Sequence, residues 1–381
     1  MKNVQLSYTP VLPIGRIHHV EKEYESDLNF WAENPLFYHP NLLVNYYYSK
    51  EVKNKEVYKN IKRDIKGQYF GDSGGYQTMS VDGGVNIDPL DVLRWQEENV
   101  NIGIGLDEAL PGYNAEDDMF DFNTTFLHCA EKSAKNFEIQ SKNIQNNDFK
   151  YLTVLHGTTL ERLNYWWNLI KDIPSDGYSI ATRNNNVFNT ALFYCFLKDR
   201  IDSNKIIHSL AGSGMKIFPI LLKFSKYWGQ NFTFDNSFVM HDTRMKAYYV
   251  ESGIDLIMKK SNAKILYIGR NSHIDENLEP PCNCGVCKKY GLKTLMQDNN
   301  LGYIALENHN LKVMLDSMEL VGKVSEFPEF EQYLHPTTKI ALQFIDFADK
   351  EGLEKAVIKY KPYFMAEMNE IKKQAALDKW A

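Results

Sequence analysis

Residues 68–77 read Gln-Tyr-Phe-Gly-Asp-Ser-Gly-Gly-Tyr-Gln, and this stretch decides the fold. A short apolar run ends at Asp72, and two adjacent glycines, Gly74 and Gly75, follow closely. Short apolar runs bounded by glycine-rich turns are typical of buried strands. Because glycine has no side chain, such a turn adopts backbone angles that other residues avoid and lets a ligand approach the main chain. The stretch therefore predicts a buried strand that presents a carboxylate at its end.

The same order of features recurs along the chain: an apolar run, a polar or glycine-rich end, then a longer amphipathic stretch. Eight such runs lie at residues 42–48, 68–71, 102–106, 151–155, 177–181, 206–210, 232–234 and 266–268. Strands that alternate with helices predict a parallel sheet, and eight units predict an α/β fold of the closed (β/α)8 TIM-barrel type. The carboxyl ends of barrel strands build the active site. Here they carry Asp72, Asp107, His156, Gly212 and Asp235.

Three parts of the chain follow from this parsing. We expect residues 1–40 to form an N-terminal cap and residues 41–314 to form the barrel, including a zinc-binding subdomain at about 271–314. Residues 315–381 are rich in Lys, Glu and Ala at helical spacing, which predicts a C-terminal helical segment packed on the barrel.

Composition bounds the class of protein. The chain has 381 residues, 44% of them hydrophobic, which suffices for a large core. Its formal charge of −6 does not indicate a nucleic-acid binder, but a local basic patch would be enough for one. The N-terminus has no apolar leader pattern, and no stretch approaches the roughly 18 apolar residues of a membrane span. We therefore expect a cytoplasmic protein, of a bacterium or of a phage-infected cell, that does not bind membranes.

Three of the five cysteines fall in the pattern Cys282-x-Cys284-x-x-Cys287, and His309 follows. Three thiolates and one imidazole complete a tetrahedral zinc site. A site with four protein ligands has no open position, so the expected single zinc ion is structural. Three structural thiols without metal are the alternative. His273 is a competing fourth ligand, although it precedes the cysteines.

Carboxylates are the second chemical feature. Asp72, Asp107 and Asp235 each follow a predicted strand, and three carboxylates around one mouth would raise the pKa of at least one of them. That arrangement suits a general acid/base combined with an ionised nucleophile. Taken singly, an aspartate after a strand is more often a helix N-cap.

Together these residues resemble the tRNA-guanine transglycosylase superfamily over most of the chain. The string Asp72-Ser73-Gly74-Gly75-Tyr76-Gln77 is similar to the family signature in which the aspartate is the general acid/base. Asp235, in Phe-Asp-Asn-Ser, is similar to the family's nucleophile, and Asp107 to the residue that binds the N1/N2 edge of a guanine-type base. The resemblance also implies a zinc set of Cys282, Cys284, Cys287 and His309. For the base pocket it implies a set of further residues: Ser73, Gly74, Tyr76, Gln77, His156, Gly212 and Arg244.

Departures from the bacterial tRNA enzymes concern the substrate more than the chemistry. His156-Gly157-Thr158 stands where those enzymes have Gln-Gly-Gly, and Asp242-Thr243-Arg244 where they have Pro-Thr-Arg. The chain looks more like the divergent branch that inserts 7-deazaguanines into DNA. The resemblance therefore implies an enzyme, a pentosyltransferase that replaces guanine in a polynucleotide, DNA favoured, with a preQ0-like 7-deazaguanine through a covalent aspartyl intermediate.

Other readings remain open at this point. The same reaction on tRNA is one, and a non-catalytic partner subunit that keeps the fold and the zinc is another. The resemblance also allows a homodimer or a partner protein.

Overall fold

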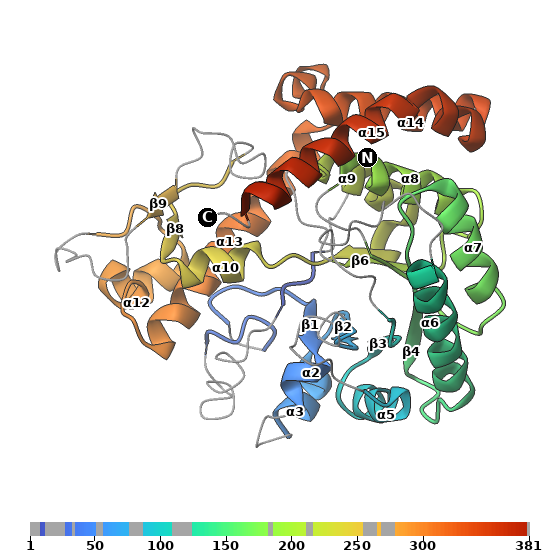
Figure 1. Cartoon of the computed structure of the whole chain (residues 1–381). Helices are drawn as coiled ribbons and strands as arrows, with labels where there is room; N and C mark the ends of the chain where they lie inside the picture. The colour runs from blue at the N-terminus through green and yellow to red at the C-terminus, as the bar shows by residue number, and fades with distance from the viewer. Residues whose placement is uncertain are drawn as a thin grey trace.

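The structure is a computed structural model that describes residues 8–11, 27–32, 35–50, 56–75, 87–108, 124–181, 186–210, 216–253, 265–267 and 279–378. Its centre is a curled parallel sheet of seven strands in the order β1 to β7 (Figure 1). The strands are β1 Leu42–Asn45, β2 Tyr69–Asp72, β3 Ile102–Ile104, β4 Lys150–Leu155, β5 Gly177–Ala181, β6 Ile206–Leu210 and β7 Phe232–Phe234. Each coincides with one of the first seven predicted runs, so the α/β fold and the parallel sheet are confirmed.

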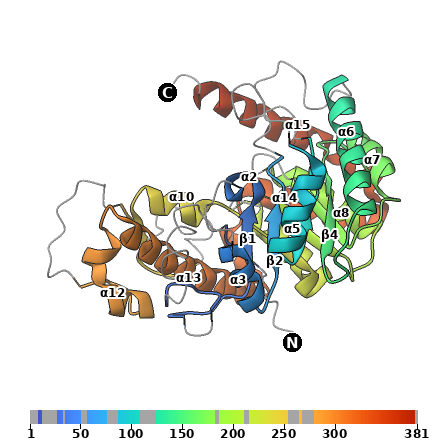
Figure 2. The same cartoon turned by 90° about the horizontal axis from the view of Figure 1, so that it is seen from below.

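Helices connect successive strands and lie on the outer side of the curled sheet (Figures 1 and 2). They are α2 Tyr46–Ser49, α3 Glu56–Asp64, α5 Pro89–Asn99, α6 Thr124–Lys142, α7 Leu160–Ile170, α8 Val187–Lys198 and α9 Phe218–Trp228, with the 3-10 turn η1 Gly229–Asn231 after α9. Their starts follow local rules. Asp88 caps α5 by accepting from Leu90 N, and Pro89 occupies the first helical turn, where a missing N–H costs nothing.

The side chains of β7 alternate between the two faces of the sheet. Phe232 stacks on Phe224 of α9 with ring centroids 4.8 Å apart, and Phe234 packs edge-on against Phe218 of the same helix. Successive strand residues point to opposite faces. Thr233 and the following Asp235 therefore face the inside of the curl, away from the helices.

Residues 8–11 lie between the two edges of the sheet. Tyr8 forms a parallel bridge with Phe234 of β7, and Val11 forms one with Leu43 of β1. Two backbone hydrogen bonds accompany the bridges, from Thr9 N to Phe234 O at 2.8 Å and from Leu43 N to Pro10 O at 2.9 Å. Both edge strands are thus bonded to the same short N-terminal segment.

The prediction of an eighth barrel strand at 266–268 is wrong. The described residues there belong to β9 Ile265–Tyr267, which pairs antiparallel with β8 Ala247–Tyr249 in a separate two-stranded sheet. A short apolar run indicates a strand but does not specify its partner. β8, which follows α10 Phe238–Arg244, is much nearer to β9 in sequence than β1 is. Closing the shorter loop costs less conformational entropy, so the pairing of β9 with β8 competes with pairing to β1.

The described C-terminal part, which ends at Asp378, is helical. It comprises α12 Gly285–Leu295, α13 Asn300–Val324, the 3-10 helix η2 Pro328–Tyr333, α14 Pro336–Glu351 and α15 Leu353–Asp378. The buried Glu367 of α15 accepts from Val187 N at 2.8 Å and from Phe188 N at 3.0 Å. A carboxylate at a helix N-terminus satisfies free N–H groups and opposes the helix dipole. The contact fixes α15 at the start of α8, beside the carboxyl edge of the sheet.

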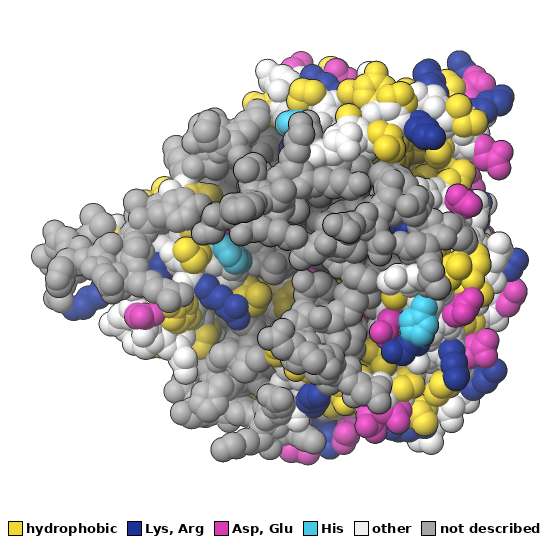
Figure 3. All heavy atoms as spheres, in the orientation of Figure 1, with side chains coloured by type: hydrophobic (Ala, Val, Ile, Leu, Met, Phe, Trp, Pro, Cys, Tyr) yellow, Lys and Arg dark blue, Asp and Glu magenta, His cyan; other side chains and the backbone are white. Residues whose placement is uncertain are grey.

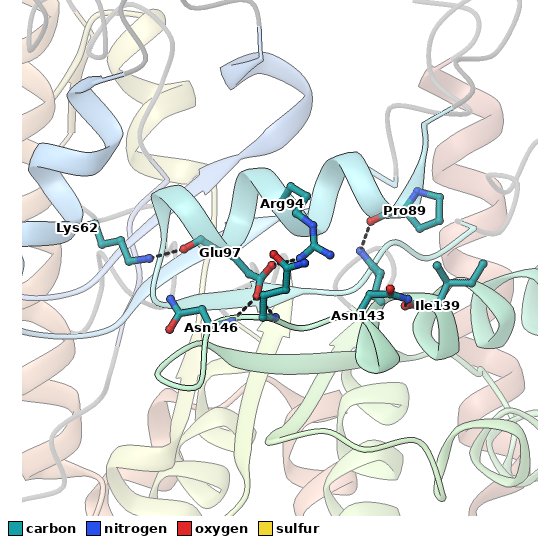
Figure 4. A network of polar contacts seen from close by, with 9 residues as sticks. Lys62, Pro89, Arg94, Glu97, Ile139, Asn143 and Asn146 are labelled. Carbon is teal, nitrogen blue, oxygen red and sulfur yellow. Dashed lines mark hydrogen bonds and ion pairs between the residues drawn. The ribbon is translucent and has the colours of Figure 1, made fainter.

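Another buried acid, Glu97, has a structural role near the amino-terminal ends of the strands. Glu97 of α5 accepts from the backbone of Gln145 and Asn146 at 2.5 and 2.8 Å, and its own carbonyl accepts from Lys62 at 2.6 Å (Figure 4). Arg94 forms an ion pair with the same carboxylate. These contacts tie α3 and α5 to the loop that precedes β4, and they leave Glu97 fully engaged.

Candidate functional site

The carboxyl edge of the curled sheet brings together the three predicted aspartates. Asp72 ends β2, Asp107 lies three residues beyond the end of β3, and Asp235 directly follows β7. The charges of Asp107 and Asp235 both act on Asp72. Residues 35 and 163 positions apart in sequence thus form one acidic cluster, as the barrel parsing predicted.

The ionisation of Asp72 is strongly altered by its surroundings. Burial, and then the negative charges of Asp107 and Asp235, raise its pKa to about 7. A hydrogen bond from the Asn45 amide and one from the Gly74 backbone oppose the increase. A carboxyl group that titrates near neutral pH is suited to both donate and accept a proton.

Asp107 is paired with an imidazole. Its Oδ2 lies 2.7 Å from Nε2 of His156, and both side chains are buried. His156 follows β4 and packs against Trp166 of α7 with ring centroids 4.7 Å apart. The structure therefore joins two of the predicted pocket residues directly.

The two glycines after Asp72 have different functions. Gly74 has φ +80°, which side chains rarely tolerate. At Gly75, an added Cβ would lie 2.3 Å from Oδ1 of Asp107 and 2.6 Å from its carbonyl oxygen. Gly75 thus permits the loop after β2 to lie directly against Asp107. Between Asp72 and Gly74, the fully buried Ser73 hydroxyl has no hydrogen-bond partner within the described ranges.

Asp235 faces a second imidazole. Its Oδ1 lies 3.4 Å from Nε2 of His208, which projects inward from β6. The following residue, Asn236, accepts hydrogen bonds from the Tyr8 hydroxyl at its backbone oxygen (3.2 Å) and its side-chain oxygen (3.1 Å). The segment bridging the sheet edges therefore also holds the loop that carries Asp235.

Sequence reasoning missed His208 and Asn45. Both lie on strands. Asn45 is in register with the predicted Asp72, and His208 is in register with Thr233, two residues before the predicted Asp235. Period-2 alternation traced along each strand would have placed them on the inner face.

Tyr76, Gln77 and Gly212 lie outside the described residues. Arg244 is exposed at the end of α10, in contrast to the buried Asp107 and Asp235.

A second site is formed by the predicted zinc ligands. The ligand atoms of Cys282, Cys284, Cys287 and His309 all lie within 4.8 Å of one another. His309 Nδ1 lies 3.5 Å from Sγ of Cys284 and 3.2 Å from Sγ of Cys287. A tetrahedral zinc ion holds such atoms roughly 3.5–3.8 Å apart. The cluster can therefore hold a metal ion, and its donor set is consistent with zinc. His273, the alternative ligand, lies outside the described residues.

Neighbouring groups orient these four ligands. His309 Nε2 lies 2.8 Å from the carbonyl oxygen of Tyr249, so Nδ1 is the nitrogen turned toward the thiols. Tyr248 stacks on the His309 ring at 4.0 Å, and its hydroxyl lies 3.2 Å from Sγ of Cys287. The pKa of Cys284 is lowered, first by a hydrogen bond from the Cys287 thiol, which favours a thiolate there. Such contacts orient ligands and favour the metal-binding protonation state.

A side chain next to one metal-binding residue also contacts the helix that follows Asp235. Asn310, next to the ligand His309 on α13, donates to Ala247 O at 2.8 Å and accepts from Tyr249 N at 3.0 Å. It also donates to Thr243 of α10 at 3.3 Å, and α10 begins three residues after Asp235. The cysteine cluster and the Asp235 loop are therefore attached to the same helix.

Sequence comparisons give no family for the chain: no protein-family model and no curated protein matches it. Among the helices of the described ranges, none combines the length and apolar character needed to cross a membrane. In the space-filling view, basic and acidic side chains are interspersed over the described part of the face shown (Figure 3).

Proposed function

We propose that this chain is a base-exchange enzyme of the tRNA-guanine transglycosylase kind, which replaces guanine in a polynucleotide, DNA favoured, with a 7-deazaguanine. The observation that carries the proposal is the meeting of Asp72, Asp107 and Asp235 at one sheet edge, with the pKa of Asp72 raised to about 7. Base exchange requires a proton carrier that works near neutral pH and a separate carboxylate nucleophile. The cluster supplies both.

The proposal includes a closed barrel. The bonds of residues 8–11 to both β7 and β1 support this part of the proposal, in which these residues take the place of an eighth strand. In a (β/α)8 barrel the carboxyl ends of the strands form the active-site mouth. The positions of Asp72, Asp107 and Asp235 agree with that rule.

The reaction proceeds in two displacements. The target nucleotide leaves the base stack and enters the mouth. The Asp235 carboxylate attacks C1′, the C1′–N9 bond breaks, and the departing guanine takes the electron pair and a proton from Asp72. The incoming 7-deazaguanine gives its proton to Asp72, attacks C1′ and displaces Asp235. Two inversions give net retention, as in retaining glycosidases.

Asp107 and its neighbours recognise the base in this proposal. Asp107 accepts from the N1/N2 donor edge of a guanine-type base, and its hydrogen bond with His156 fixes the carboxylate in one orientation. The buried Ser73 hydroxyl, which has no partner in the described part of the chain, provides a further polar contact for a ligand.

Zinc has a structural function in this scheme. Cys282, Cys284, Cys287 and His309 would hold it through four protein ligands, and a closed site of this kind contributes folding energy. The exchange steps use only the carboxylates.

The test is incorporation of radiolabelled guanine into double-stranded DNA, single-stranded DNA and unmodified tRNA. We expect Asp235→Asn to abolish incorporation, because the amide is a poor nucleophile. The matched control is Asp148→Asn, which makes the same substitution at an exposed turn before β4.

Each outcome has a definite meaning. Asp235-dependent label in DNA supports the proposal. Label in tRNA alone would mean that the same reaction takes place on tRNA instead of DNA. Absence of label from all three substrates, or full activity of Asp235→Asn, contradicts it. If none of the three substrates takes up label, a non-catalytic partner subunit becomes the better description of this chain.

A further inference from the structure

His208 is a buried imidazole in contact with Asp235. Its side chain is fully buried within the sheet curl, and its ring stacks on Phe70 of β2 with centroids 4.5 Å apart and an interplanar angle of 27°. Stacking on Phe70 and complete burial restrict the orientation of the ring. A fully buried histidine needs partners for both ring nitrogens.

Those two nitrogens have different partners. Nδ1 lies 2.7 Å from the hydroxyl oxygen of Thr233, the inward-facing residue of β7. Nε2 lies 3.4 Å from Oδ1 of Asp235, but this contact does not have hydrogen-bond geometry, and Nε2 has no hydrogen-bond partner among the described residues. If the Thr233 hydroxyl donates to Nδ1, the neutral ring carries its proton on Nε2, directed at the carboxylate. Hydrogen bonds in active sites without substrate are often long and shorten in the reactive complex.

We infer that His208 is a positioning residue for Asp235, an inference that rests on the proposed role of Asp235 as nucleophile. The Thr233 hydroxyl sets the tautomer of His208, and Nε2–H of His208 holds Oδ1 of Asp235. The second carboxylate oxygen, Oδ2, is then directed toward C1′.

The same contact serves both displacements. In the first, Oδ2 forms the bond to C1′ while the C1′–N9 pair leaves with the base. In the second, the C1′–Oδ2 bond breaks and its electron pair returns to the carboxylate, where the donor on Oδ1 stabilises the recovered charge. His208 touches neither the base nor the sugar in this arrangement, so its loss should affect turnover more than base binding.

The experiment compares kcat and KM for guanine in His208→Leu, His208→Gln and wild type, with the full chain and the polynucleotide that accepts label. A hydrogen bond to a charged group corresponds to about 10- to 100-fold in rate. We expect His208→Leu to lower kcat by that factor with KM changed less than about twofold. His208→Gln retains an N–H donor at similar reach and should recover most of the loss.

Two further variants separate positioning from packing. Ser209→Ala is the matched control, because Ser209 is equally buried but adjacent on the same strand and on its opposite face. It should leave kcat unchanged. Thr233→Val keeps the shape of the threonine and removes its hydroxyl, so it should lower kcat several-fold even if His208→Leu does not fold.

A thermal double-mutant cycle tests the contact without any exchange assay. If His208 pairs with Asp235, the Tm losses of His208→Gln and Asp235→Asn will not add in the double variant. Wild-type protein that exchanges no base, together with non-additive Tm losses, rejects the proposed function and keeps the pairing. Wild-type kcat in His208→Leu, equal losses in His208→Leu and Ser209→Ala, or additive Tm losses overturn the inference.

Discussion

The carboxylate cluster and the cysteine cluster are assembled in opposite ways. Three of the four metal ligands lie within six consecutive residues, and only His309 comes from a distant helix. In contrast, Asp72, Asp107 and Asp235 come from three strands and owe their proximity to the curl of the sheet. Thiolates define a zinc site by their chemistry alone, whereas three identical carboxyl groups differ only through their neighbours. Asn45 faces Asp72, and an imidazole faces each of the other two.

The largest expected effect tests the locally assembled site. We expect Cys287→Ser to lose bound zinc and to destabilise the protein by several kcal/mol, because the binding free energy of a structural zinc ion contributes to folding. Zinc content by atomic absorption and thermal unfolding measure this. Cys129→Ser, a substitution at a buried cysteine of α6 outside the cluster, should keep one zinc per chain. Full zinc content in Cys287→Ser would reject the ligand set.

Asp72→Asn tests the distributed site. The amide cannot carry the proton, so the exchange rate should fall about 10²- to 10⁴-fold, while zinc content remains at the wild-type level. Steady-state incorporation of labelled guanine measures the rate. Activity within about threefold of wild type would show that Asp72 does not carry the proton in the exchange.

The pH dependence of stability tests the pKa of Asp72 independently of catalysis. Its pKa is near 3.8 when unfolded and about 7 when folded. Below pH 4 both states are protonated and the contribution is intact. As the pH rises from about 4 to about 7, the unfolded state loses its proton first, so the free energy of unfolding falls.

Asp72→Asn should lack that decrease. The difference between wild type and variant has an upper bound of about 4 kcal/mol, and solvent near this partly exposed side chain reduces it. Chemical denaturation at a series of pH values measures the difference. A constant difference between pH 4 and 8 would mean that the folded-state pKa is close to its ordinary value.

Gly75→Ala should have the smallest effect. The new Cβ would lie 2.3 Å from Oδ1 of Asp107, so the loop or the carboxylate must move. Overpacking of this kind costs about 1–3 kcal/mol, and KM for guanine should rise because Asp107 is displaced. Gly253→Ala is the control, since an added Cβ there meets nothing within 4 Å. Equal Tm and KM in the two variants would contradict the close approach.

The sequence alone predicted seven of the strands, because each is a short apolar run followed by a polar or glycine-rich end. It predicted all four members of the metal-binding cluster, since three thiols at that spacing followed by a histidine are typical of a metal site. It also predicted that Asp72, Asp107 and Asp235 would lie at one edge, because parallel strands all end on the same side of their sheet. These predictions depend on local patterns and on one general rule of topology.

Only the tertiary structure decided which segments pair and which neighbours each carboxylate receives. The apolar run at 266–268 could not be distinguished from a barrel strand, whereas residues 8–11, which carry no strand pattern, are bonded to both sheet edges. His208 and Asn45 looked ordinary in sequence because the significance of each depends on a residue 27 positions away. The physical reason is that the protonation and orientation of a carboxyl group depend on nearby charges and donors, and folding determines which those are.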